Sequence, residues 1–416
     1  LNLAPLLLSF YAIVMVSLKL LSLLLAPLAA IAHEAANSHG GQFVLTPSSG
    51  FSIDTLLADP NKYDEENAHV KQFSGGDTLA YVTPWNNHGY DVVKQFKGKF
   101  DFVSPVWYYV ERGSNGDFVL NGGHDVDRGW MDEVRDIVDN RKVGRIVPRF
   151  QFRGWTREHL QEFVKSPQDA GKLAHLITHE VEKQAFDGIV LECGYPAFFA
   201  TFLQKLSVEL HQINRVLISV LPPVRDDVSK EIMSADAFKI LAQFVDRFSL
   251  MSYDYSSGSY EGGPSSPIDW IEDNIEHLTN EENRHQLLVG INMFGMAYQQ
   301  GENPQPMVMN SIIGLLREMH EQGSTLDLVW DKEAEEHSVD ISEDDGLTEG
   351  PTVWFPTPKY IKNRIHLAED WSVGLSLWEV GQGLDSFVSS GAAIFHCFPV
   401  SCHWSNFTSI AQYDAF

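Results

Sequence analysis

Short apolar runs recur along the chain and are separated by segments with helical periodicity. Each run is nearly continuous in its hydrophobicity, which is typical of parallel strands that are covered on both faces. The runs are residues 78–85, 100–110, 144–152, 186–193, 216–222, 247–255, 287–294 and 373–379. Between them, apolar side chains recur at the spacing of a buried helix face. Two such stripes are Leu173, Leu176, Ile177 and Val181, and Trp270, Ile271, Ile275 and Leu278.

This alternation of strand and helix, repeated for all the runs, predicts an α/β fold, a (β/α)8 TIM barrel, with an open doubly wound sheet as the weaker alternative. The 416 residues, of which 44% are hydrophobic, can bury the core of one large domain. The segment 299–370 is too long for one strand–helix unit and contains two strand-like runs, 326–330 and 352–355. We therefore expect a small β insertion between barrel strands 7 and 8. The acid-rich stretch 331–349 is predicted to be a solvated loop, because its carboxylates lack the alternate spacing of a calcium loop.

The two ends of the chain differ in composition from the rest. Residues 3–32 are almost wholly apolar with Lys19 as the one charged residue, and Ala30-Ile31-Ala32 is a small-x-small cleavage site before His33. We expect 1–32 to be a signal peptide, with an uncleaved signal anchor as the alternative because the stretch is long enough to span a bilayer. A loose polar segment, 33–76, is expected before the barrel at 77–387, and an atypical tail, 388–416, after it.

The charge of the chain excludes some partners. A formal net charge of −26 and a pI near 4.9 leave no basic stripe for a nucleic-acid backbone or an anionic membrane. The 16 histidines show neither an H-E-x-x-H motif nor another paired ligand spacing. The sequence therefore predicts no nucleic-acid partner, no metal site and no cofactor.

Three cysteines are too few for a disulfide scaffold. Cys397 and Cys402 could form a disulfide in an oxidising compartment, and the alternative is three free thiols with Cys193 packed beside its strand. Asn406 begins an N-x-S/T acceptor for glycosylation, which requires that the tail is exposed in the secretory lumen.

The run around residue 190 reads Phe186-Asp187-Gly188-Ile189-Val190-Leu191-Glu192-Cys193-Gly194. It resembles the F-D-G-x-D-x-D-x-E strand of glycoside hydrolase family 18, the chitinases and chitinase-like proteins, in which the final Glu protonates the leaving oxygen. Here Val190 and Glu192 stand at the two preceding carboxylate positions, and Gly194 stands at the acid position. The resemblance thus implies a catalytic strand without its acid. Asp187, at the start of the strand, is interpreted as a structural hydrogen-bonding residue.

Three further motifs of that family occur in order at predicted strand ends. Met251-Ser252-Tyr253-Asp254 is similar to M-x-Y-D, the run 290–295 is similar to G-x-P/N-x-Y/F-G, and Leu377-Trp378-Glu379 ends the eighth strand. Within the family, the chain most resembles the chitinase domain-containing proteins, also called stabilin-interacting chitinase-like proteins. That resemblance implies a secreted or lysosomal saccharide-binding protein and a possible sorting receptor of the stabilin type. The tail after about Val388 departs from the pattern.

The resemblance also assigns candidate roles. Family 18 enzymes are substrate-assisted, so they need one acid together with groups that orient the sugar acetamide. Tyr253 and Asp254 suit the second task, Met251 lies beside them, and Trp378 is expected to form the floor of the central sugar subsite.

Further aromatic residues near predicted strand ends are candidate stacking platforms for pyranose rings: Trp85, Trp107 and Tyr108. Glu192 is expected to face inward, either contacting a ligand or hydrogen-bonding Tyr253 or a buried water. In an extended strand it lies about 7 Å below position 194 and cannot reach the same oxygen.

These observations favour a catalytically degenerate chitinase-like lectin that binds N-acetylated, chitin-type oligosaccharides without cleaving them. A weak glycoside hydrolase that uses Glu192 after a strand bulge is the first alternative. An interaction protein with a vestigial pocket, sorted by a receptor, is the second.

Overall fold

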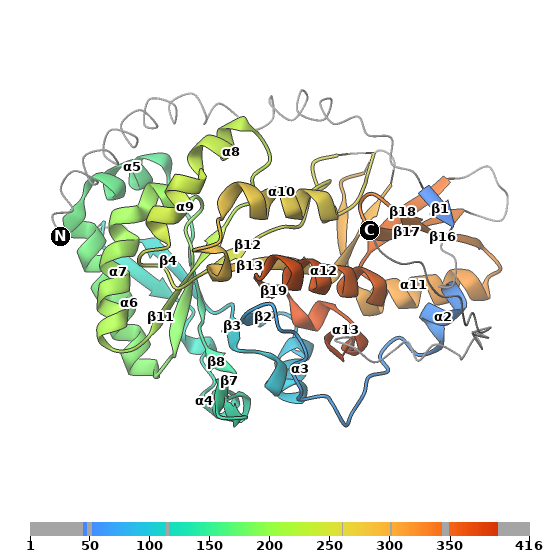
Figure 1. The fold of residues 1–416 in the computed structure, drawn as a ribbon, viewed down its shortest axis with the longest axis horizontal. Coiled ribbons are helices and arrows are strands. Elements are labelled where there is room, and N and C mark those ends of the chain that lie inside the picture. The colour runs from blue at the N-terminus through green and yellow to red at the C-terminus, as the bar shows by residue number, and fades with distance from the viewer. Residues whose placement is uncertain are drawn as a thin grey trace, which may run out of the picture.

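The computed structural model describes residues 45–47, 52–113, 116–259, 261–299, 302–342 and 349–389 (Figure 1). The apolar leader 1–32, Asn406, and the cysteines at 397 and 402 lie outside these residues, so the predictions on them stay predictions. Within the described residues, no helix is long and apolar enough to cross a membrane.

The eight apolar runs form the strands of a closed parallel barrel, so the predicted TIM-barrel fold is confirmed. Its strands are β2 (Thr78–Val82), β3 (Phe102–Pro105), β8 (Arg145–Ile146) with β9 (Arg149–Phe152), β10 (Gly188–Glu192), β11 (Val216–Leu221), β12 (Arg247–Leu250), β13 (Leu287–Asn292) and β19 (Gly374–Trp378). The ring closes because β8 pairs with β3 while β9 pairs with β10. Only Val147 and Pro148 separate β8 from β9, and they carry the ladder across the gap through hydrogen bonds to Val103 and Val190.

The predicted run 100–110 divides into two strands. After β3, the chain bends at Val106 and Trp107, and β4 (Tyr108–Arg112) then pairs with β9 and with β5 (Phe118–Asn121) outside the barrel ring. A small hairpin, β6 (Asp136–Val138) and β7 (Arg141–Val143), follows helix α4 (Arg128–Val134). The side chains of β4 therefore meet a different environment from those of β3.

Helices cover the outside of the barrel, as Figure 1 shows. They are α3 (His88–Gln95), α4 (Arg128–Val134), α5 (Arg157–Lys165), α6 (Pro167–Gln184), α7 (Ala200–Gln212), α8 (Asp227–Ile232), α9 (Ala235–Leu241), α10 (Ile268–Leu278), α12 (Pro358–Trp371) and α13 (Asp385–Ser389). Short 3-10 turns are η2 (Lys97–Lys99), η3 (Gly123–Asp125), η4 (Pro196–Phe199), η5 (Arg284–Gln286) and η6 (Val380–Gln382). In α6, Ser166 caps the amino end, Pro167 takes the first position, and the predicted stripe through Leu173, Ile177 and Val181 is buried.

The predicted β insertion between the seventh and eighth barrel strands is present. It comprises β14 (Phe294–Tyr298), β15 (Gln305–Val308), β16 (Thr325–Asp331), β17 (Glu336–Ser342) and β18 (Glu349–Phe355), with helix α11 (Met309–Glu321). Two elements from the segment expected to be loose join this part of the fold. Strand β1 (Leu45–Pro47) pairs with β16, and α2 (Ile53–Ala58) buries Ile53 and Leu56. The expectation of a loose segment is therefore wrong for those residues.

The acid-rich stretch 331–349 is not a solvated loop throughout, so that prediction is corrected. Strand β17 occupies its centre, and Asp331 and Glu336 are buried. Glu336 accepts backbone hydrogen bonds from Ser265 and Ser266 and lies 3.6 Å from the Arg364 guanidinium. These partners compensate the cost of burying the carboxylate, which charge counting along the sequence cannot reveal.

The barrel interior is a packed core, so a ligand could bind only at one of its ends. Its filling side chains are Leu79, Tyr81, Phe102, Val106, Val147, Val190, Ile218, Val220 and Leu288. Of the two ends, we call the one formed by the carboxyl ends of the parallel strands the barrel mouth. Functional residues of such barrels lie at the mouth.

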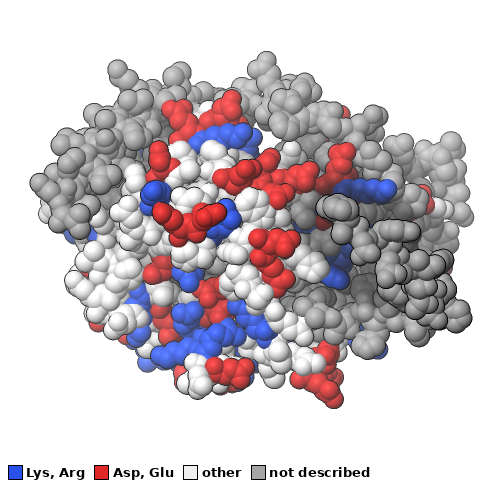
Figure 2. Space-filling view, in the orientation of Figure 1, with Lys and Arg blue, Asp and Glu red and all other residues white. Residues whose placement is uncertain are grey.

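The surface charge is unevenly distributed. In Figure 2, acidic side chains spread over the upper part of the face shown, whereas Lys and Arg gather lower down, over the region of β7 and β8. At the amino end of the barrel, Arg141 forms an ion pair with Asp101, and Arg135 forms one with Asp187.

Candidate functional site

The degenerate motif of strand β10 spans the barrel from its amino end to its mouth. Before the strand, Asp187 accepts hydrogen bonds from the Arg135 side chain and from the Ile146 backbone, both 2.9 Å long. Asp187 is thus fixed at the end opposite the mouth. Val190 is fully buried in the barrel interior, and Glu192 ends the strand at the mouth. The motif therefore presents one carboxylate to the site.

Gly194 lies in the exposed loop that follows β10. Its φ of +81° is in the left-handed region, and a Cβ added there would meet no atom within 4 Å. The preceding Cys193 is a free, buried cysteine, and burial raises the pKa of its thiol far above the ordinary value. The loop thus has room for a side chain at position 194, and the glycine there supplies no ionisable group.

Both oxygens of Glu192 are already engaged. Strand β9 places Gln151 directly opposite Glu192 and Arg149 opposite Val190, so these side chains share the inward face of the sheet. Arg149 Nη1 donates to Glu192 Oε2 at 2.9 Å, and Gln151 Nε2 donates to Glu192 Oε1 at 2.7 Å. Of the expected partners of Glu192, Tyr253 is therefore replaced by Arg149 and Gln151, which β9 places on the same face of the sheet.

Arg149 was missed in the sequence analysis. Its guanidinium also donates to Gln151 Oε1 at 3.2 Å and lies 5.6 Å from the centre of the Trp378 ring. The available signal was a pair of arginines, Arg145 and Arg149, inside an apolar strand run, since a charge at such a position needs a partner when buried. Arg149 therefore lies between the Glu192 carboxylate and the Trp378 ring.

The structure brings Trp378, Met251 and Tyr253 together. Trp378 ends β19 and meets Tyr81 edge-on, with 5.2 Å between ring centres. Trp378 and Met251 pack against one apolar cluster, which consists of Tyr253, Phe294, Met296, Tyr298 and Trp354. Most of these rings come from β14 and β18 of the insertion, so the insertion forms one wall beside the barrel mouth.

Tyr253 and Asp254 follow β12 with their backbone held by Arg225. Its guanidinium donates to the carbonyl oxygens of both residues, at 3.2 and 3.1 Å. Burial raises the pKa of the Tyr253 hydroxyl well above its ordinary value, and the nearby Tyr81, Asp254 and Glu192 add to this, so Tyr253 remains a neutral hydroxyl. Burial also raises the pKa of Asp254, although the Arg225 charge opposes the shift.

The remaining aromatic candidates separate into exposed and buried. Trp85, in the loop after β2, is 63% exposed and is free to contact a ligand. Trp107 and Tyr108 are each only 1% exposed. The Trp107 indole donates to the Tyr90 hydroxyl at 2.8 Å, and Tyr108 stacks on Phe150. The prediction that Trp107 and Tyr108 are stacking platforms is wrong, because the bend after β3 turns these rings into the core between sheet and helices.

Another carboxyl, that of Glu379, directly follows Trp378 in the sequence. It is 1% exposed and accepts hydrogen bonds from Asn86 Nδ2 at 2.6 Å and from the Gly381 amide at 3.1 Å. Burial raises its pKa to about 7, and these two hydrogen bonds oppose that shift. Glu379 was not among the predicted site residues, and its position directly after a strand-end Trp was the signal in the sequence.

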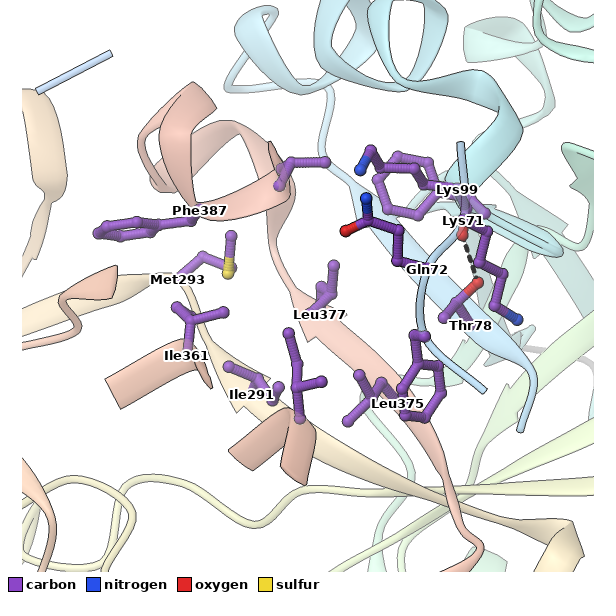
Figure 3. Close-up of a pocket in the computed structure, with 14 residues that line it drawn as sticks. Lys71, Gln72, Thr78, Lys99, Ile291, Met293, Ile361, Leu375, Leu377 and Phe387 are labelled. Carbon is purple, nitrogen blue, oxygen red and sulfur yellow. Dashed lines mark hydrogen bonds between the residues drawn. The ribbon is translucent and has the colours of Figure 1, made fainter. Parts of the chain in front are cut away.

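A separate cavity of about 70 Å³ lies outside the barrel wall (Figure 3). Ile291, Leu375 and Leu377 of the strands face Ile361 of α12 and Phe387 of α13 across it. Its lining is mostly apolar, with Lys71, Lys99 and Gln72 to one side. Such a space between barrel and helices offers few polar groups to sugar hydroxyls, so the candidate site stays at the mouth. Among the described residues, no cluster of three or more His, Cys, Asp or Glu side chains could hold a metal ion.

Comparisons with known proteins agree on the fold and the family. The profile of "Glycosyl hydrolases family 18" matches residues 77–383. The structure is similar to a chitinase from Chromobacterium violaceum, with a TM-score of 0.62 and 17% identity over 77% of this chain and 100% of that chain. It is also similar to the spore cortex-lytic enzyme SleL of Bacillus cereus, with a TM-score of 0.59 and 15% identity over 76% and 73% of the two chains.

A third similar structure contains a bound saccharide. It is a mutant of catalytic domain 2 of the Group II chitinase from Ostrinia furnacalis, in complex with penta-N-acetylchitooctaose. The TM-score is 0.56 and the identity 12%, over 76% of this chain and 95% of that chain. At such identities these likenesses establish the shared fold, whereas the profile match covers most of the chain. The protein therefore belongs to glycoside hydrolase family 18.

Proposed function

We propose that this protein is a catalytically degenerate family 18 member that binds N-acetylated, chitin-type oligosaccharides at the barrel mouth without cleaving them. The observation that carries the proposal is the state of the motif strand, where position 194 has no side chain and Glu192 is bound by Arg149 and Gln151. General acid catalysis requires a carboxylic acid that donates a proton to the leaving oxygen. Glu192 instead accepts two hydrogen bonds.

The groups that would hold a sugar remain in place. Trp378 supplies an indole ring at the mouth for the apolar face of a pyranose, and Trp85 supplies an exposed ring in the neighbouring loop. The neutral Tyr253 hydroxyl and the Asp254 carboxyl suit an acetamide group. The N-acetylated ligand in the Ostrinia furnacalis structure is consistent with this ligand class. A degenerate enzyme that keeps these groups is a lectin.

Calorimetry with fully N-acetylated chitopentaose, called chitopentaose below, and with its deacetylated form tests the proposal. We expect the acetylated oligomer to bind with a dissociation constant between about 1 µM and 1 mM, or about 4 to 8 kcal/mol, and more tightly than the deacetylated one. Trp378→Ala should weaken binding by about 1 to 3 kcal/mol through lost stacking area. Trp371→Ala is the matched control, because Trp371 ends α12 away from the mouth and donates to Glu272. Equal affinity in all three proteins would leave the mouth without a saccharide role.

The motif likeness to stabilin-interacting chitinase-like proteins supports a second proposal, on location. We propose that the chain enters the secretory pathway and reaches the lysosome or the exterior, with a sorting receptor as partner. The apolar leader and the cleavage site before His33 support this. N-terminal sequencing of the protein from a secretory cell should begin at His33. A membrane-bound product that retains the leader would instead support a signal anchor.

A further inference from the structure

Glu379 forms the structural connection between two loops of the barrel mouth. Its backbone follows Trp378 at the end of β19, and its Oε1 accepts from Asn86, which follows Trp85 in the loop after β2. Its Oε2 accepts from the Gly381 amide at the start of η6. One buried carboxyl thus joins the loop of the exposed indole to the strand end of the floor indole.

The backbones around Glu379 are in direct contact. A Cβ added to Gly381 would lie 2.4 Å from the Gly89 amide nitrogen, so only glycine permits this approach of η6 to α3. A Cβ added to Gly89 would lie 3.0 Å from Glu379 Oε2. Because no water-sized gap separates the elements there, the carboxyl has no solvent around it when the loops are together. Its charged form therefore lacks hydration in the assembled site.

We propose that Glu379 is a positioning residue of the saccharide site, which holds the Trp85 loop against the Trp378 strand end when neutral and loosens that loop when ionised. The proposal rests on the proposed saccharide function. It makes the assembly of the site, and with it ligand affinity, dependent on pH.

The burial of Glu379 determines whether the loop opens as the pH rises or as it falls. In the assembled site, burial raises the pKa of Glu379 to about 7, whereas a solvated carboxyl in an opened loop would have a pKa near the ordinary 4.5. Raising the pH therefore favours the open loop, because that state releases the proton more readily. In acid, the neutral carboxyl remains satisfied, since its O–H can donate to the Asn86 oxygen after an amide flip while the other oxygen accepts from Gly381.

Other titratable groups lie on the elements around Glu379. Helix α3 carries Tyr90 and also His88, which pairs with Asp385 of α13 at 3.2 Å. Burial raises the pKa of Tyr90 to about 12, so it does not change charge near neutrality. On β2, which also packs against η6, Tyr81 points into the barrel interior. Burial also raises the pKa of Asp254, and the Arg225 charge opposes that shift. His88 is the group to control for, because it lies on α3 and pairs with a carboxylate.

The binding arm of the test is calorimetry of chitopentaose from pH 5.5 to pH 8. Wild type should lose affinity by about three- to tenfold over this range. Glu379→Gln keeps a neutral side chain that can donate to Asn86 and accept from Gly381, so it should keep the acid-side affinity at every pH. His88→Gln should retain the wild-type pH dependence. If Glu379→Gln still loses affinity between pH 5.5 and pH 8, the proposal is overturned. It is also overturned if that loss of affinity disappears in His88→Gln alone.

The second arm needs no ligand. Hydrogen exchange of peptides spanning residues 84–90 should be faster in wild type than in Glu379→Gln at pH 8, and equal in the two proteins at pH 5.5. Asn86→Ala should exchange quickly at both pH values. If no saccharide binds but this exchange difference appears, the saccharide function falls and the positioning link stands. Equal exchange at pH 8 would refute the link itself, whatever the ligand does.

Discussion

Replacing Arg149 by methionine should destabilise the fold by about 2 to 3 kcal/mol. The Arg149 side chain is 8% exposed, that of Glu192 is 22% exposed, and their closest contact is 2.9 Å. Removing one partner of a fully buried ion pair costs about 3 to 5 kcal/mol, because it leaves an uncompensated charge. The partial exposure of Glu192 and its remaining hydrogen bond from Gln151 lower that cost.

Urea unfolding of a double-mutant cycle measures the pair. Arg149→Met, Glu192→Leu and the double variant should give a coupling free energy of about 1 to 3 kcal/mol. Arg153→Met is the matched control, because Arg153 pairs with Glu111 at 2.6 Å but is 52% exposed, so its loss should cost less than about 1 kcal/mol. Equal losses in Arg149→Met and Arg153→Met would refute the reasoning that Glu192 is held by a buried partner.

Other perturbations separate binding from stability. Trp85→Ala should weaken chitopentaose binding while changing the unfolding free energy by less than about 0.5 kcal/mol, since the indole is mostly in solvent; a large stability loss would contradict its loop position. Gly194→Glu should cost about 1 to 2 kcal/mol, because φ is +81°, and should not create a hydrolase in a fluorogenic chitobioside assay, since Val190 supplies no carboxylate beside it. Between pH 4.5 and 7, folded Glu379 keeps a proton that the unfolded chain has released, so wild-type stability should fall relative to Glu379→Gln as pH rises, by up to about 3 kcal/mol in urea titrations; parallel pH curves would exclude this.

The barrel could be predicted from the sequence because its strands are covered on both faces. Runs such as 216–222 and 287–294 are nearly continuous in apolar residues, with Ser219 and Asn292 as their polar positions, and the structure places β11 and β13 inside them. The insertion was predicted only in outline. Its strand β17 has a buried acid, Glu336, whose partners, such as Arg364, come from distant positions. Burial of charge depends on those partners, which lie far away in the sequence.

The candidate site, like the fold, was predicted from the sequence in part. Motif spacing was enough to predict that Trp378, Met251 and Tyr253 come together, because each ends or follows a parallel strand. The burial of Trp107 and Tyr108 could not be predicted, since it depends on a backbone bend between β3 and β4. The engagement of Glu192 depends on the register of β9 against β10, which periodicity leaves open.

The most direct test of the central claim is to measure binding and turnover of chitopentaose on one preparation. We predict saturable binding without any hydrolysis between pH 4 and 8, because general acid catalysis contributes a factor on the order of 10²–10⁴ and position 194 lacks a side chain. Hydrolysis that disappears in Glu192→Gln would contradict the account and identify Glu192 as the acid of a working enzyme.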